Sequence, residues 1–225
     1  MARSFTLAQL RTKVQQRGSF ENSADITATI LLDFINEAIA ELWDLMIQRW
    51  QDYYVTRTNL TVTANLDGVT LPSDMYKLRK LEIVDSSSPS GYRRLRPHDL
   101  DAAHAFSPLS GDKNYRYRLE NAKLYLAPIP TQAETLRLFY IPCAGQLAVD
   151  SDTFDGVNGY EALVIALTLK RCYDRQDMPT GSIDAEIARL TQRIRVAADS
   201  RDADEPFSLA ARGPQNEAWD ESEWI

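Results

Sequence analysis

The chain has 225 residues and a formal net charge of −7 at pH 7, with 44% hydrophobic and 25% charged residues. This length can bury a full core in one domain or in two closely packed ones, and the composition is ordinary for a soluble globular protein. The negative charge argues against a protein that grips phosphates broadly, although it is compatible with one that DNA passes without adhering.

The sequence lacks the signals of a secreted, membrane or metal-binding protein. No apolar run approaches the ~18 residues needed to span a bilayer, and residues 1–6 have no apolar signal-peptide core. The two cysteines, Cys143 and Cys172, come without clustered histidines and offer neither a disulfide framework nor a zinc spacing. We therefore expect a protein that stays in the cytoplasm where it is made, with no cofactor and no metal.

A short amphipathic helix is predicted to begin after Thr6. Thr6 and Gln9 have the spacing of a capping box, and Phe5 precedes them as a staple residue. Gly18 is a typical residue at a helix end. A thin apolar stripe between these signals consists of Leu7, Leu10 and Val14.

One long helix is predicted next, over residues 25–50. Its apolar side chains cover about half of the circumference, which is more than one neighbour can bury. They are Leu31, Phe34, Ile35, Ala38, Ile39, Leu42, Trp43, Leu45, Met46 and Trp50. Four carboxylates, here called the acidic ridge, occupy the opposite face: Asp33, Glu37, Glu41 and Asp44.

The acidic ridge has two interpretations. A solvated helix face is the more common one. The alternative is a ridge that meets basic groups of another subunit or lines a passage for something negatively charged. Arg189 and Arg193, four residues apart on the last predicted helix, are natural partners for it. The sequence leaves open whether they pair with the ridge within one subunit or between two.

Strand patterns replace the helical ones between residues 52 and 142. Stretches rich in threonine, valine and aromatic residues are residues 54–63, 69–71, 78–84, 115–119, 123–126 and 135–141. The last of these alternates weakly, as expected for a central strand covered on both faces. A short helix is expected over residues 97–106, with Pro97 in its first turn.

Helical patterns return after a linker at residues 143–157. Residues 160–173 are apolar nearly all round, which is typical of a helix in the middle of a bundle. The last helix carries a clean stripe of Ile183, Ile187, Leu190, Ile194 and Ala197. The order predicts an α+β fold, in which a helical bundle from residues 1–51 and 158–199 is interrupted by a small antiparallel β insertion at residues 52–142.

The remaining residues, 200–225, read as an extended acidic arm with no helical period. The arm also contains apolar and aromatic residues that a purely solvating tail does not need: Pro206, Phe207, Leu209, Trp219, Trp224 and Ile225. Spaced anchors in an acidic segment favour folding onto a partner's groove, whereas the alternative is an ordinary frayed terminus.

Motifs for catalysis are absent or weak. There is no glycine-rich phosphate loop and no zinc or calcium spacing, and the spacing of His98 and His104 puts them on different faces of the expected short helix. Glu37 and Glu41 can be considered as the acid/base pair of a glycan hydrolase. No adjoining groove or aromatic subsite is readable, so a solvated helix face is favoured.

The most basic part of the chain offers a further alternative, a nucleic-acid-binding module. Its arginines alternate with tyrosines, a mixture that can contact phosphates and stack on bases. It can equally be the outer face of a small sheet, paired with Glu82 and Glu120, and the acidic net charge favours this second interpretation. The residues concerned are Arg93, Arg94, Arg96, Arg116 and Arg118 with Tyr92, Tyr115 and Tyr117.

The order of several short segments resembles a known family. They are FINEAIAELW (34–43), DYYVT (52–56), LPSDMYKL (71–78), YRLEN (117–121), LAPIP (126–130), LFYIP (138–142) and DGVNGYE (155–161), followed by an Arg/Asp-rich helix and the acidic arm. In this order they are similar to the head-to-tail adaptor proteins of tailed bacteriophages, also called connector or head-completion proteins. The similarity covers nearly the whole chain, and its motifs are structural.

This resemblance implies a structural virion protein that is not an enzyme and uses no cofactor. The expected partners are further copies of itself in a homo-dodecameric ring, the portal protein above, a tail or nozzle protein below, and DNA that moves through the ejection channel without specific binding. No membrane is involved. The arm is expected to bind the portal, and the expected location is the virion neck, with assembly in the host cytoplasm.

Overall fold

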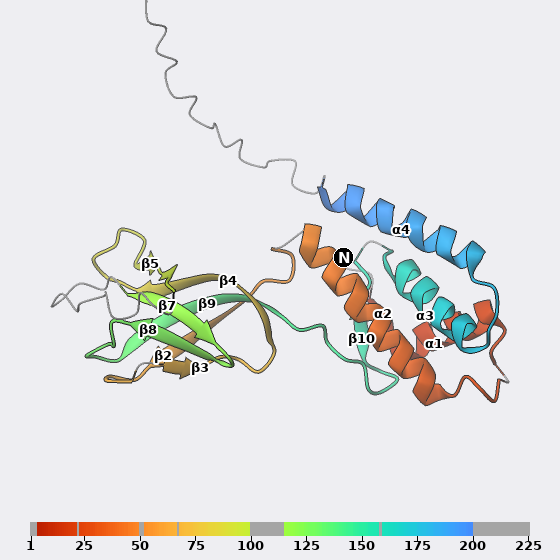
Figure 1. Ribbon diagram of the computed structural model, residues 1–225, viewed down its shortest axis with the longest axis horizontal. Coiled ribbons are helices and arrows are strands. Elements are labelled where there is room, and N and C mark those ends of the chain that lie inside the picture. Colours follow the sequence, from red (N-terminus) through yellow and green to blue (C-terminus); the bar gives the residue numbers. More distant parts are fainter. Residues whose placement is uncertain are drawn as a thin grey trace, which may run out of the picture.

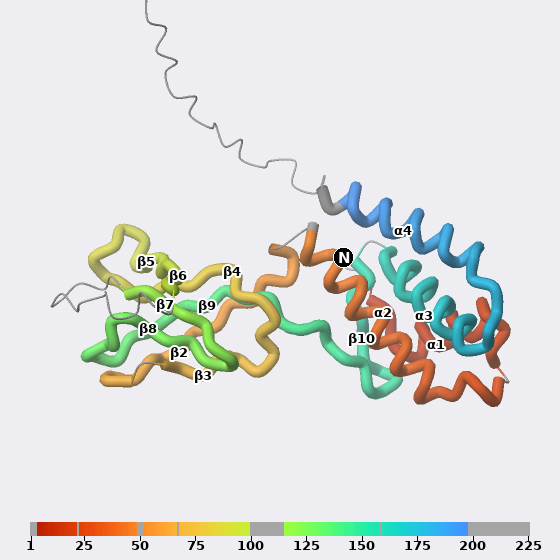
Figure 2. Tube along the Cα trace, viewed as in Figure 1, coloured from red at the N-terminus to blue at the C-terminus, as the bar shows by residue number. Residues whose placement is uncertain are grey.

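The computed structural model describes residues 4–21, 23–49, 52–66, 68–99, 115–157 and 159–199, and within these ranges the chain forms four helices and ten strands. The helices come from the two ends of the chain and pack into one lobe, whereas the strands of residues 56–142 form a second lobe beside it (Figure 1). The chain trace shows that the molecule is elongated along the line that joins the lobes (Figure 2). This arrangement is the predicted α+β fold.

Helix α1 (Leu7–Gly18) begins at the predicted capping box. The Gln9 amide donates to the Thr6 hydroxyl over 3.2 Å, and the Thr6 amide donates to the Gln9 side chain over 3.0 Å. Gly18 is the last helical residue, but the left-handed conformation falls on Ser19, at φ 56°. A Cβ on Gly18 would lie 2.2 Å from the Phe20 ring, so the glycine is required by packing.

Helices α2 (Ala28–Arg49), α3 (Glu161–Arg175) and α4 (Gly181–Asp199) complete the bundle. Helix α2 starts three residues later than predicted, because the Thr27 hydroxyl accepts a hydrogen bond from the Ile30 amide and caps the helix. Helix α3 packs against the other three helices, which confirms its predicted place in the middle. The stripe on α4 faces the core, where Ile183, Leu190 and Ile194 are buried.

Two short strands close the helical core. Strand β1 (Ser4–Thr6) pairs antiparallel with β10 (Thr153–Asp155), with Phe5 opposite Phe154. Both phenylalanines belong to the core of the bundle, as does Leu147. The segment expected as a linker, residues 143–157, therefore supplies a strand and core side chains to the helical lobe.

The β lobe consists of two four-stranded sheets with a shared core. One has the order β2 (Thr56–Val62), β9 (Glu134–Pro142), β4 (Met75–Val84) and β5 (Tyr92–Arg94). The other has the order β3 (Gly68–Thr70), β8 (Lys123–Ala127), β7 (Arg116–Glu120) and β6 (Arg96–Pro97). Strand β9 is central, as predicted, but its burial alternates along the strand, so one face is buried and the other is only partly covered. The core between the sheets is Val62, Leu71, Leu81, Ile83, Leu95, Leu124, Leu126, Leu136, Leu138 and Tyr140.

The helix expected to start at Pro97 is not formed at its first residues. Arg96 and Pro97 are strand β6, parallel to β7, and the His98 amide donates to the Tyr117 carbonyl over 3.0 Å. The reason lies just upstream. The backbone amide of the buried Leu95 donates to the Leu81 carbonyl, and Arg96 is held extended because it precedes a proline. The rest of the expected helix, with His104, lies outside the described residues.

Aromatic side chains join the two lobes. The rings of Trp43 and Tyr54 stack with centroids 3.6 Å apart, and Tyr53 meets Tyr54 edge-on. The Trp43 indole N–H donates to the Pro142 carbonyl over 3.2 Å, at the end of β9. Burial raises the pKa of Tyr54, so its hydroxyl stays protonated through the physiological range.

Candidate functional site

The acidic ridge of α2 faces a basic side chain of α3. Arg171 donates to Glu37 through Nε over 2.8 Å and to Glu41 through a terminal nitrogen. The two carboxylate side chains are still 58% and 53% exposed. Asp33 is exposed as well, and Asp44 accepts a hydrogen bond that raises the pKa of Tyr76. The Arg171 guanidinium is therefore ion-paired with two of the four carboxylates, and the ridge keeps an excess of negative charge.

Arg171 was not anticipated as a partner of the ridge. We expected Arg189 and Arg193, but in the described part of a single subunit the guanidinium on the ridge belongs to α3. Arg189 is exposed on α4. Arg193, also on α4, reaches towards the start of α3: a Cβ added to Gly159 would lie 3.9 Å from its guanidinium and 3.8 Å from the Glu161 carboxylate. The missed signal was the position of Arg171 on a helix whose other faces are almost wholly apolar.

A groove lies beside the ridge, between α2 and α4, and side chains of α3 also line it. Its lining is apolar along the floor and polar at the rim, and consists of Leu45, Leu163, Leu167 and Ile187 with Glu41, Asp44, Gln48 and Thr191. Leu45, Leu167 and Ile187 are only partly buried in the subunit. The groove therefore exposes apolar side chains next to Asp44 and to Glu41, which shares the Arg171 guanidinium with Glu37.

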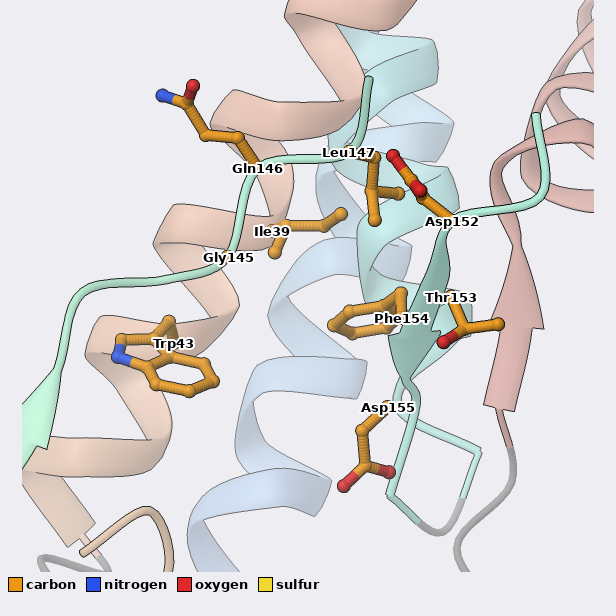
Figure 3. Close-up of a pocket in the computed structure, with 9 residues that line it drawn as sticks. All are labelled: Ile39, Trp43, Gly145, Gln146, Leu147, Asp152, Thr153, Phe154 and Asp155. Atoms are coloured by element: carbon orange, nitrogen blue, oxygen red, sulfur yellow. The ribbon is translucent and has the colours of Figure 1, made fainter. Parts of the chain in front are cut away.

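A second pocket lies between α2 and residues 145–155 (Figure 3). Ile39, Trp43 and Phe154 line it with apolar surface, and Asp152 and Asp155 lie at its edge. Both carboxylates are held by local hydrogen bonds. The backbone amides of Val149 and Ala148 lower the pKa of Asp152, and Asp155 accepts from the Tyr53 hydroxyl and the Val157 amide. These bonds fix the shape of the loop.

The glycan hydrolase alternative gains nothing from this geometry. Glu37 and Glu41 share one guanidinium and are more than half exposed, whereas a catalytic acid needs an environment that keeps it protonated. Among the described residues, no group of three or more histidine, cysteine or acidic side chains is arranged to hold a metal ion. Cys172 is buried, which raises the pKa of its thiol to about 11, so it is not a reactive nucleophile.

The arginines of the nucleic-acid alternative are divided between the two sheets. Arg93 is paired with Asp85 over 2.8 Å, and Arg118 with Glu120 over 2.8 Å. Arg94 pairs in register with Glu82 in one sheet, and Arg96 with Arg116 in the other. The structure thus supports the interpretation that these residues belong to sheet faces and lie beside Glu82 and Glu120.

Glu82 organises the outer face of the sheet β2-β9-β4-β5. Burial acts to raise the pKa of its carboxyl, but hydrogen bonds from Lys80 and Arg137 outweigh burial and the pKa is lowered. The Arg137 guanidinium also lies 3.3 Å from the centroid of the Tyr92 ring. The Tyr92 ring is therefore already covered by the Arg137 guanidinium, which leaves this ring unsuited to stacking on a base.

The predicted portal-binding residues lie outside the described part of the chain. Pro206, Phe207, Leu209, Trp219, Trp224 and Ile225 all belong to residues 200–225, and their role stays a prediction. None of the helices in the described ranges combines the length and apolar character that crossing a bilayer requires.

Comparison with known proteins gives one family. The model of the family described as "SU10 adaptor protein" matches residues 5–214. No curated protein matches the chain. Among solved structures, a chain from the "Neck of empty GTA particle computed with C6 symmetry" is 17% identical, with 87% of this chain and 95% of that chain covered and a TM-score of 0.30. That score is too low to support an argument about this chain.

Proposed function

Because the chain belongs to the SU10 adaptor protein family, we propose that it is a structural head-to-tail adaptor of a tailed bacteriophage. The single observation that supports this most is the family match, which spans both lobes. In the proposed role the protein catalyses no reaction. It forms a ring of twelve copies beneath the portal, extends the channel through which DNA is ejected, and offers a docking surface to the tail or nozzle protein.

The charges of the chain fit this role. The acidic ridge and the arginines of α4, Arg189 and Arg193, serve the contacts between copies or the wall of the channel. Where carboxylates face the channel, they repel the phosphates and keep DNA from adhering. The protein then resides in the virion neck after assembly in the host cytoplasm.

The acidic arm is the proposed link to the portal. Residues 200–225 carry seven acidic side chains and two arginines, with Phe207, Trp219 and Trp224 as apolar anchors. Aromatic anchors often supply most of the binding energy at an interface.

The test is attachment to portal rings from the same phage, viewed by electron microscopy. The full chain should add a twelve-fold collar, and a chain that lacks residues 206–225 should fail to attach while keeping the circular dichroism of the folded core. Trp219→Ala with Trp224→Ala should weaken attachment strongly. The matched control, Gln215→Ala with Asn216→Ala, changes the same arm without removing an anchor. Attachment by the truncated chain would rule out the role of the arm.

A further inference from the structure

The groove beside the acidic ridge has the properties of a docking site for a helix. Its floor is formed by leucine and isoleucine side chains of α2, α3 and α4, and one wall carries Glu41 and Asp44. Since Arg171 already serves both Glu37 and Glu41, the wall stays net negative. An occupant that matches it must present small or apolar side chains for the floor and positive charge for the wall.

The outer face of α4 has this complementary character. Residues 187–198 contain no acidic side chain and three arginines, Arg189, Arg193 and Arg195. The exposed positions of α4 along this face are Ala185, Ala188, Arg189, Gln192, Arg195 and Val196. Alanines at Ala185 and Ala188 let another helix approach closely, and Val196 is 57% exposed. The helix thus carries Arg189 and Arg195 on the two flanks of a narrow strip of alanine and valine side chains that Gln192 interrupts.

The groove and the outer face of α4 lie on different sides of the same subunit. Ile187 and Thr191 line the groove, whereas the residues of the strip are exposed on α4, which lies along one edge of the helical lobe (Figure 1). One copy can therefore use both surfaces at once, with a different neighbour on each. Such a head-to-tail contact closes into a ring or continues as a helical array.

We propose that the outer face of α4 of one copy docks in the groove between α2 and α4 of the next copy, with Arg189 and Arg195 against Glu41 and Asp44. This inference rests on the proposed function only for the closure of the contact into a ring. It assigns the excess negative charge of the acidic ridge to an interface between copies, because the same chain supplies a face with the complementary charge.

The experiment reverses the charges on each side separately, in the full chain. The groove variant carries Glu41→Lys and Asp44→Lys, and the helix variant carries Arg189→Glu and Arg195→Glu. Sedimentation should show self-association of the wild-type chain, and at least about tenfold weaker association of each variant alone. An equal mixture of the two variants should recover association, because every contact then joins opposite charges.

The matched control is Arg57→Glu with Arg94→Glu, which reverses two exposed arginines on the sheet β2-β9-β4-β5 and should associate like the wild type. The proposal is overturned if either variant associates like the wild type, if the mixture fails to recover, or if the wild-type chain stays monomeric at its solubility limit. If collars on portal rings still form under any of these outcomes, the interface proposed here is wrong but the proposed adaptor function stands. Recovery in the mixture without any collar on portal rings rejects the adaptor function alone.

Discussion

Replacing Asn36 with alanine removes two hydrogen bonds that tie the segment after β9 to α2. The Asn36 amide nitrogen donates to the Leu147 carbonyl over 3.0 Å, and the Leu147 amide donates back to the Asn36 oxygen over 2.9 Å. Leu147 is 6% exposed, so both of its backbone groups lose their partners in a poorly hydrated place. Each such group costs about 1–3 kcal/mol. Because Asn36 itself is half-buried and water can enter, we expect a total loss of about 2–4 kcal/mol.

The assay is chemical denaturation followed by the helical circular dichroism signal, which reports the lobe that contains Asn36. The matched control is Asn59→Ala, at an exposed position of β2, which should stay within about 0.5 kcal/mol of the wild type. Asn36→Asp keeps the acceptor for the Leu147 amide but places a second oxygen against the Leu147 carbonyl. The two oxygens repel, so this variant should also lower the free energy of unfolding. A stability of Asn36→Ala equal to that of the control refutes this account of the segment.

Two further outcomes follow from single side chains. Thr6→Ala removes the hydroxyl of the capping box and should cost about 1 kcal/mol in thermal or chemical unfolding; Thr56→Ala, exposed at the start of β2, is the control. Glu82 has a lowered pKa when folded, so its contribution to stability is present above the unfolded value near pH 4.3 and is lost as the pH falls through the lower folded value. In Glu82→Gln the free energy of unfolding should depend less on pH as the pH falls below about 5. An unchanged pH dependence contradicts the ion-paired role of Glu82.

Local patterns predicted the helices well, because their signals lie within a few residues. The capping box at Thr6 and Gln9 needs only three residues of sequence, and α3 is marked by apolar residues on nearly every face. The pairing of β1 with β10 gives no such signal, since three-residue strands have no readable alternation. The hydrogen bonds between Asn36 and Leu147 join residues 111 positions apart, and no local rule indicates them.

The acidic ridge could be predicted from the sequence, but its basic partner could not. Its four carboxylates and their common face were readable from helical spacing. Their partner was not, because the choice between Arg171 and Arg189 depends on how α3 and α4 are rotated against α2. That rotation is set by the packing of the whole core, so a nearly all-apolar helix conceals which of its few charged positions will face a neighbour.

The β lobe enters and leaves the bundle through neighbouring strands. Thr56 at the start of β2 is paired with Tyr140 near the end of β9, and paired residues in antiparallel strands have Cα atoms about 5 Å apart. A turn of a few residues can span that gap, so the path of the chain through the bundle can be continued without the β lobe.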